Sequence, residues 1–261
     1  MNVLERFRLD GKTAIVTGGT SRFGAPIARA LAEAGANVVI ASRHVQSCET
    51  LAAELREEGY SAVGMQVNLA DDASICRLAV ETAHRYGRID ILVNNAVSRK
   101  SLAELDGLTR EKILDSMNVN VAGQITMIQS VLPYMPDGGS IILMSSTSGL
   151  CAPKFSVMTA KRMSPANYTV EKWGINGLTR WLAAKYGKAG IRVNCLCPGT
   201  FDPGMFDDPE NEEYIRNVAA YSPIPRFIQA EEIAGPALFL ASEASSFCTG
   251  VLLPVDGGYT I

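Results

Sequence analysis

The sequence has few of the residues that bind metals and no long run of one residue class. Its 261 residues include only two histidines and six scattered cysteines, without C-x-x-C or H-x-x-x-H spacing, so we expect no zinc site and free thiols. No apolar stretch reaches about 18 residues and no signal-peptide pattern is present, so we expect no membrane span and a cytoplasmic location. The net charge of -3 and the lack of a lysine or arginine run argue against nucleic acid or a membrane as partner. A small-molecule partner fits better.

Two kinds of segment alternate along the chain. Short runs rich in valine and isoleucine are typical of strands buried on both faces, and they occur at 13–17, 37–41, 62–67, 89–93, 140–144, 192–196 and 251–255. Between them alanine and leucine recur every three or four residues, which predicts helices at 23–34, 45–58, 72–86, 109–134, 165–188 and 230–242. This order predicts one α/β domain over residues 1–261, a single-domain Rossmann fold with a doubly wound, seven-stranded parallel sheet and helices on both faces.

One segment breaks the alternation. Residues 201–227 contain four prolines among acidic residues and show no clear strand or helix pattern. Long irregular segments in compact domains are usually functional or mobile. We therefore interpret this one as a flap over the substrate, with a plain surface excursion as the alternative.

A glycine-rich turn joins the first predicted strand to the first predicted helix. Glycines let the backbone approach a pyrophosphate, and the free N–H groups of a helix N-terminus face its charge. A tight turn without a ligand is the alternative, but the position between first strand and first helix favours a dinucleotide site. The residues expected at the cofactor here are Gly18, Thr20, Ser21, Arg22, Phe23 and Gly24.

The end of the second predicted strand bears on the choice between NAD and NADP. An acidic side chain at this place binds the ribose 2′-hydroxyl of NAD, whereas the 2′-phosphate of NADP needs a small polar group and a cation. The chain has Ser42 and Arg43 there, and Arg22 and His44 lie in segments that reach the same place. We therefore favour NADP(H), with NAD(H) as the alternative. A further alternative is that Arg43 is an ordinary exposed side chain that binds no cofactor.

A tyrosine and a lysine stand four residues apart in a predicted helix. Tyr168 and Lys172 thus project from one face. An ammonium group near a phenol stabilises the phenolate, and this lets a tyrosine exchange protons closer to neutral pH. The spacing alone is common by chance, so its weight depends on the other motifs.

Taken together, these motifs resemble the short-chain dehydrogenase/reductase family over essentially the whole chain. The resemblance begins at Leu9-Asp10-Gly11-Lys12 and ends at Val255-Asp256-Gly257-Gly258. Besides the turn and the Tyr/Lys pair, it includes Asn94-Asn95-Ala96, Asn120, Ser146 and Pro198-Gly199.

The resemblance implies a role for each of four residues. Tyr168 is the expected general acid/base, and Lys172 stabilises its phenolate while holding the nicotinamide ribose. Ser146 binds the substrate oxygen; it is preferred to Ser145 because the family's serine typically stands three residues before a glycine, here Gly149. Asn120 is expected to position Lys172 through a bridging water. Further cofactor contacts are expected at Asn68, Leu69, Asn95, Ala96, Tyr168, Lys172, Pro198 and Gly199, and Asn94 is expected to brace the central strands.

The chain also departs from the family pattern. Arg22 and Val97 replace glycines, Asn68 replaces an aspartate and Pro203 replaces a frequent threonine. The chain between Ser146 and Tyr168 is longer than is common, so residues 151–163 are expected to form an inserted loop at the mouth of the pocket. Its cations Lys154, Lys161 and Arg162 suggest a sugar-derived or anionic substrate, and a surface or subunit-contact loop is the alternative.

These features predict an NADP(H)-dependent oxidoreductase that transfers hydride between the nicotinamide and a ketone or secondary alcohol. Two other classes remain: a lyase or epimerase that retains its cofactor, and a non-catalytic dinucleotide sensor. The resemblance further implies a homo-oligomer, either a tetramer or a dimer.

Overall fold

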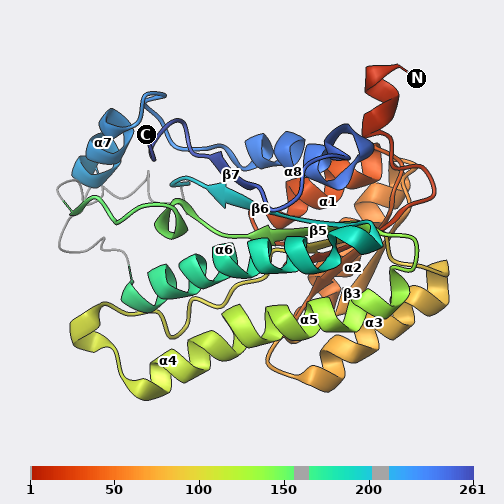
Figure 1. The fold of residues 1–261 in the computed structure, drawn as a ribbon, viewed down its shortest axis with the longest axis horizontal. Helices are drawn as coiled ribbons and strands as arrows, with labels where there is room; N and C mark the ends of the chain where they lie inside the picture. Colours follow the sequence, from red (N-terminus) through yellow and green to blue (C-terminus); the bar gives the residue numbers. More distant parts are fainter. Residues whose placement is uncertain (1, 156–164, 202–211) are drawn as a thin grey trace.

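The computed structural model describes residues 2–155, 165–201 and 212–261. Within these ranges seven strands form one parallel sheet in the order β3-β2-β1-β4-β5-β6-β7 (Figure 1). The strands are β1 (Thr13–Thr17), β2 (Asn37–Ser42), β3 (Ala62–Gln66), β4 (Ile91–Asn94), β5 (Gly139–Met144), β6 (Ile191–Pro198) and β7 (Leu252–Val255). The predicted fold class, a doubly wound parallel sheet of seven strands, is confirmed.

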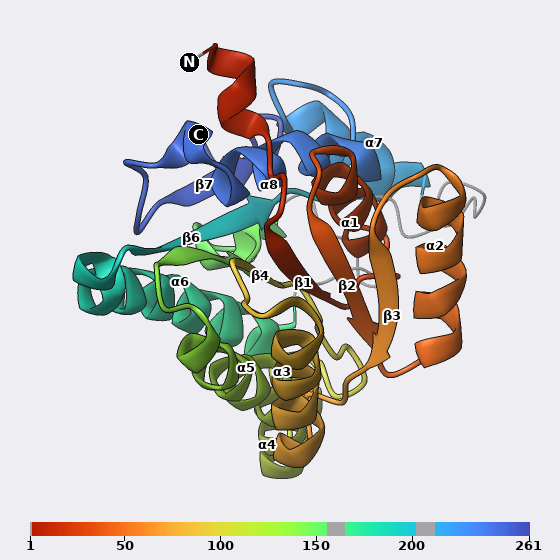
Figure 2. The same cartoon turned by 90° about the vertical axis from the view of Figure 1, so that its right-hand side faces the viewer.

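Helices cover both faces of the sheet (Figure 2). One face packs against α1 (Gly24–Glu33), α2 (Val45–Glu57) and α8 (Ala234–Ala241). The other packs against α3 (Asp72–Tyr86), α5 (Gly123–Val131) and α6 (Ala166–Tyr186). No helix among the described residues is both long enough and apolar enough to cross a bilayer.

The central strand β1 is buried along its whole length because helices cover both sheet faces. In β1, Ala14 and Val16 pack into the core under α1, whereas Ile15 packs into the core under α3 and α5. All three side chains are fully buried. Successive side chains of a strand point to opposite faces, so a strand covered on both sides needs an unbroken apolar run.

The strand order changes direction between β1 and β4. Strands β1, β2 and β3 extend one way from the centre, and β4 to β7 extend the other way. In open parallel sheets, ligands bind beyond the carboxyl ends of the strands at such a switch point. The turn after Thr17 and the segment after Asn94 leave the sheet at this point.

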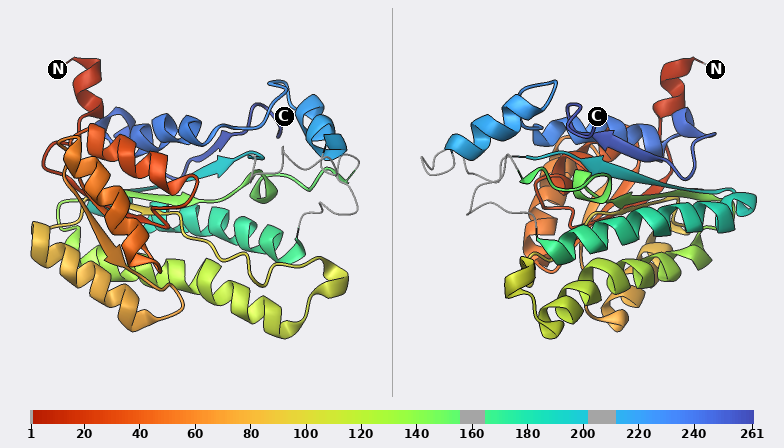
Figure 3. Two further views of the ribbon diagram at one scale, coloured as in Figure 1. Left: turned by 180° about the vertical axis from the view of Figure 1, so that it is seen from behind. Right: turned by 60° about the vertical axis from the view of Figure 1, so that its left-hand side comes forward.

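The predicted helix over 109–134 is wrong in detail. The chain forms α4 (Arg110–Met117), a π-helical turn (Asn118–Ala122), α5 and a final 3-10 turn (Leu132–Tyr134) along one path (Figure 3). The π turn inserts an extra residue into the helix and buries Asn120. A pattern of apolar spacing registers only a continuous helix, so it misses this turn.

The prediction of an irregular flap over 201–227 is wrong for residues Glu212–Tyr221, which form helix α7. Tyr214 and Val218 lie four residues apart on its buried face and pack with Phe227. The four prolines lie on either side of α7 and none lies within it, and two glutamates in its first turn favour a helix N-terminus. Residues 202–211 lie outside the described residues.

Candidate active site

A cavity of about 550 Å³ lies beyond the carboxyl ends of the central strands. Its wall comes from the turn after β1, the ends of β2, β4, β5 and β6, and the first part of α6. Of the residues predicted to bind cofactor or to act in catalysis, only Gly24 and Asn120 do not line it. The cavity is large enough for a nucleotide and a small substrate.

The glycine-rich turn forms the floor of one end. Gly18 has φ +61°, and a Cβ there would lie 2.9 Å from the Cα of Ala96, so only glycine fits without strain. Gly24 contacts the carbonyl oxygen of Gly18 from the first turn of α1, where a Cβ would overlap that oxygen. Gly24 thus shapes the turn from beneath, and it is absent from the cavity wall because the turn itself covers it.

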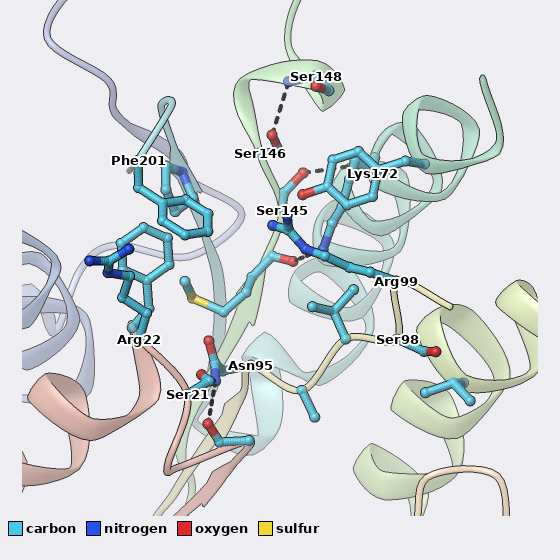
Figure 4. A pocket seen from close by; sticks show the side chains of 18 of the residues that line it. Ser21, Arg22, Asn95, Ser98, Arg99, Ser145, Ser146, Ser148, Lys172 and Phe201 are labelled. Atoms are coloured by element: carbon cyan, nitrogen blue, oxygen red, sulfur yellow. Dashed lines mark hydrogen bonds between the residues drawn. The ribbon is translucent and has the colours of Figure 1, made fainter. Parts of the chain in front are cut away.

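Asn95 holds the turn from the neighbouring strand. Its side-chain amide donates to the carbonyl oxygens of Thr17 and Gly18, both at 3.0 Å, and to Ser21 Oγ at 3.1 Å (Figure 4). Asn94, fully buried, accepts from Thr17 Oγ1 and donates to the carbonyl oxygen of Gln124, so it braces β1, β4 and α5 as expected. The position of the turn is therefore fixed by hydrogen bonds from the residue that follows β4.

The turn presents unpaired donors at the start of α1. The backbone N–H groups of Arg22 and Phe23 make no hydrogen bond to another described residue, and both residues line the cavity. Such groups at a helix N-terminus bind phosphate. This end of the cavity can therefore bind a phosphate group, as the sequence predicts for a pyrophosphate.

The end of the cavity beside β2 and β3, where the sequence predicts the adenosine, is polar and carries a cation. Ser42 and Arg43 line it together with His44, and Ser42 Oγ accepts from the N–H of His44 at 3.2 Å. Asn68 lines it as well, but its amide oxygen already accepts from the N–H of Ala70 at 3.2 Å. The amide oxygen has a second lone pair, so this turn reduces but does not remove its capacity to bind an adenine amino group.

Ser146, Tyr168 and Lys172 line the other end of the cavity. The Lys172 ammonium lies 5.4 Å from the centre of the Tyr168 ring and donates to the carbonyl oxygen of Met144 at 2.7 Å. Ser146 Oγ accepts from the N–H of Ser148 at 3.2 Å, so its proton is free for another acceptor. Ser145 Oγ is buried and donates to the carbonyl oxygen of Lys172, which makes Ser146 the more accessible of the two serines.

Asn120 lies behind this end of the cavity. Its side-chain amide oxygen accepts from the N–H of Ser98 at 2.7 Å, and its amide nitrogen donates to the Ser98 carbonyl oxygen at 2.9 Å and to Glu171 at 2.8 Å. The side chain thus fixes the segment after β4. No hydrogen bond joins the side chain of Asn120 to Lys172 among the described residues.

Glu171 is a site residue that the sequence reasoning missed. It is buried, and its carboxylate accepts from Asn120 and from the hydroxyl of Ser116. A signal was available, because Glu171 falls on the buried stripe of α6 at four-residue spacing with Asn167 and Ile175. A buried carboxylate must be hydrogen-bonded to persist, and here both of its oxygens are.

Arg99, Phe201 and Tyr259 also line the cavity, although no motif singled them out. The guanidinium groups of Arg22 and Arg99 both lie over the ring of Phe201. The distance from the guanidinium carbon to the ring centre is 5.9 Å for Arg22 and 5.4 Å for Arg99. Tyr259 also lines this end, and burial raises its pKa to about 12. Phe201 thus links the glycine-rich turn to the segment after β4 across the cavity.

The inserted loop is described only in part. Cys151, Ala152 and Pro153 line the cavity. Lys154 does not: its ammonium donates to the hydroxyl of Tyr221 at 2.9 Å and lies 4.5 Å from the centre of that ring. Lys154 therefore ties the loop to α7 and is not among the residues facing a substrate. Lys161 and Arg162 lie outside the described residues.

The chain is similar in sequence and structure to known dehydrogenases. The family described as enoyl-(acyl carrier protein) reductase matches residues 19–260. D-threitol dehydrogenase of Mycolicibacterium smegmatis is 36% identical over 98% of this chain and 95% of that protein. L-fucose dehydrogenase of Oryctolagus cuniculus is 33% identical over 96% of this chain and 86% of that protein. The structure of a gluconate 5-dehydrogenase from Burkholderia cenocepacia, in complex with NADP and tartrate, superposes with a TM-score of 0.89 at 35% identity and covers 99% of both chains.

Fold, site and relatives together define the class: an oxidoreductase that acts on alcohols and carbonyls with a nicotinamide dinucleotide. More narrowly, the chain belongs to the short-chain dehydrogenase/reductase family. The resemblance drawn from the motifs is thereby confirmed.

Proposed function

We propose that the protein is an NADP(H)-dependent oxidoreductase that transfers hydride between the nicotinamide and a ketone or secondary alcohol of a sugar-derived substrate. The observation that carries this proposal is the meeting of Ser146, Tyr168 and Lys172 in one cavity with the phosphate-binding turn. When bound, the dinucleotide supplies or accepts the hydride, and the side chains handle the proton.

The three side chains divide the work of proton transfer. Ser146 has a free hydroxyl proton and binds the substrate oxygen. Tyr168 gives its phenolic proton to that oxygen during reduction and takes it back during oxidation. The ammonium of Lys172, buried and held by the Met144 carbonyl oxygen, lies beside the Tyr168 ring and would hold the nicotinamide ribose. Asn120 and Glu171 act through the backbone of Ser98 and hold the wall of the cavity.

The preference for NADP rests on Ser42 and Arg43. Both line the adenosine end, no acidic side chain does so among the described residues, and Arg43 has no described acidic partner. A free guanidinium suits a 2′-phosphate. Arg43→Ala is expected to weaken NADPH binding about 10-fold or more and NADH binding far less. Equal losses for the two cofactors, measured by fluorescence titration, would remove this argument.

The relatives support a sugar-derived substrate. Their names specify threitol, fucose and gluconate, all polyhydroxylated small molecules. The substrate end of the cavity is rich in hydroxyl groups, with Ser146, Ser148 and Tyr259 in its wall. Such groups bind a polyol by hydrogen bonds that alternate between donor and acceptor.

A homo-oligomer, a dimer or a tetramer, is supported by the outward face of α6. Val170, Trp173 and Trp181 lie on this face and are 61%, 52% and 57% exposed. Large apolar side chains gathered on one exposed helix face are typical of a protein interface. Helices α5 and α6 run side by side on this face of the molecule (Figures 1 and 3).

Replacing Tyr168 with phenylalanine tests the proposed chemistry. The variant keeps the ring but loses the proton donor, so turnover is expected to fall by at least about 100-fold while NADPH affinity stays within severalfold. Near-normal turnover would refute the assignment. Wild-type protein mixed with NADPH and a ketone panel separates the alternatives: product without net cofactor oxidation indicates a lyase or epimerase, and binding without turnover indicates a sensor.

A further inference from the structure

The described part of the cavity wall carries positive charge and no negative charge. Arg22, Arg43, Arg99 and Lys172 line it, and none of its described residues is aspartate or glutamate. The whole chain has a net charge of -3, so this excess of cations is local. A cleft lined by one sign of charge attracts ligands of the other sign.

Three of these cations have a partner in the proposed reaction. Arg43 faces the place of the 2′-phosphate, Arg22 adjoins the free N–H groups that suit the pyrophosphate, and Lys172 serves Tyr168 and the ribose. Arg99 remains. Among the described residues it forms no ion pair, and its guanidinium lies 5.4 Å from the centre of the Phe201 ring.

Arg99 lies at the reacting end of the cavity. It follows β4, and its side chain extends into the pocket beside Ser145 and Lys172 (Figure 4). The residue before it is held firmly, because both backbone groups of Ser98 hydrogen-bond to the side chain of Asn120, which Glu171 holds in turn. The base of the Arg99 side chain is thus fixed by a buried network, as a specificity residue requires.

We propose that Arg99 binds a carboxylate on the substrate, so that the enzyme's substrates are polyhydroxylated acids and their keto-acid counterparts. This inference rests on the proposed function. The planar guanidinium matches a carboxylate with two parallel hydrogen bonds. In the reduction, hydride adds to the ketone carbon and Tyr168 protonates its oxygen; the carboxylate stays ionised and unchanged, and serves only to orient the substrate.

Paired acidic and neutral polyols test this proposal by binding alone. D-Gluconate with sorbitol, and tartrate with threitol, differ mainly by carboxylate groups. Calorimetric titration into the wild-type protein saturated with NADP⁺ is expected to show at least one acid binding tighter than its neutral partner. Arg99→Gln is expected to weaken that acid about 10- to 100-fold and to leave NADP⁺ affinity within about threefold. Arg99→Lys keeps the charge but not the two-pronged geometry, so an intermediate loss is expected.

Lys100→Gln is the matched control. It removes the same charge at the next position, and Lys100 is exposed and absent from the cavity wall, so acid binding is expected to stay at the wild-type level. Equal binding of acids and neutral polyols by the wild type would overturn the proposal. So would an Arg99→Gln variant that loses NADP⁺ as strongly as the acid, because Arg99 would then be a cofactor contact.

Failure of the proposed function gives a different result. If the protein oxidises NADPH with neither keto-acids nor neutral ketones, the oxidoreductase mechanism fails, whatever binding the acids show in the titration. If neutral ketones are reduced as well as keto-acids and Arg99→Gln changes neither, the mechanism stands and the carboxylate site is overturned.

Discussion

Glu171 gives a sharp test of the buried network behind the active site. Its carboxylate is buried and accepts from Asn120 and Ser116, and Asn120 in turn holds the backbone of Ser98. Glu171→Ala removes both acceptors at once. We expect the stability of the fold to fall and the cavity wall at Ser98 to shift in the same variant, because one network holds both.

The size of the effect follows from the hydrogen bonds that are lost. Each buried donor left without its acceptor costs about 1–3 kcal/mol, and two donors are affected here. Release of a buried carboxylate offsets a part of this cost, so we expect a net loss of about 2–4 kcal/mol in the free energy of unfolding. Glu171→Gln keeps the volume and an acceptor for Asn120, while the Ser116 hydroxyl can turn to accept, so a change within about 1 kcal/mol is expected.

Urea unfolding followed by circular dichroism measures these differences. Glu111→Ala on α4, where the side chain is exposed, is the control and is expected to stay within about 0.5 kcal/mol of the wild type. An alanine variant as stable as the wild type would show that the network contributes nothing. A glutamine variant as damaged as the alanine variant would show that stability depends on the charge of Glu171 and not on the number of hydrogen bonds it accepts.

Two further predictions concern the turn and the subunit interface. Gly24→Ala places a Cβ against the Gly18 carbonyl oxygen, so the free energy of unfolding is expected to fall by about 1–3 kcal/mol and NADPH binding to weaken. Gly235→Ala is the control, because a Cβ there meets open space, and it is expected to leave both quantities nearly unchanged. Thermal unfolding and cofactor titration measure the two quantities. Trp173→Ser is expected to shift the protein toward smaller species in light scattering, whereas Val80→Ser, at an exposed position of α3, is not. An unchanged mass in both variants would exclude the outward face of α6 as the interface.

The sequence predicts the sheet well because its strands are buried on both faces. Runs such as residues 13–17 are short, rich in β-branched residues and fully buried, and this combination is typical of the central strands of a covered parallel sheet. The helix α7 was missed because prolines on both sides suggested irregular chain, although Tyr214 and Val218 have helical spacing. Local composition outweighed periodicity there.

The site was predictable where a residue's role is tied to a fixed place in the chain. The turn after β1 and the Tyr168/Lys172 pair stand at such places, and the structure brings them to one cavity. Glu171 and Arg99 were not predictable in this way. A charged residue in a helix is normally assigned to the surface, and the four-residue spacing of Glu171 with buried Ile175 is a weak signal beside that rule. The packing of α6 against the π turn establishes that Glu171 is buried. Whether Arg99 points into the cavity or away from it depends on how Ser98 is held.

Direct transfer of hydride from the cofactor is the central claim, and isotope labelling measures it. The wild-type protein is incubated with NADPH carrying deuterium at the transferable C4 position and with a sugar-derived keto-acid, and the product is analysed by mass spectrometry. The account predicts one deuterium on the new carbinol carbon for each cofactor oxidised. Product without deuterium, or product formed with no net oxidation of NADPH, would contradict it.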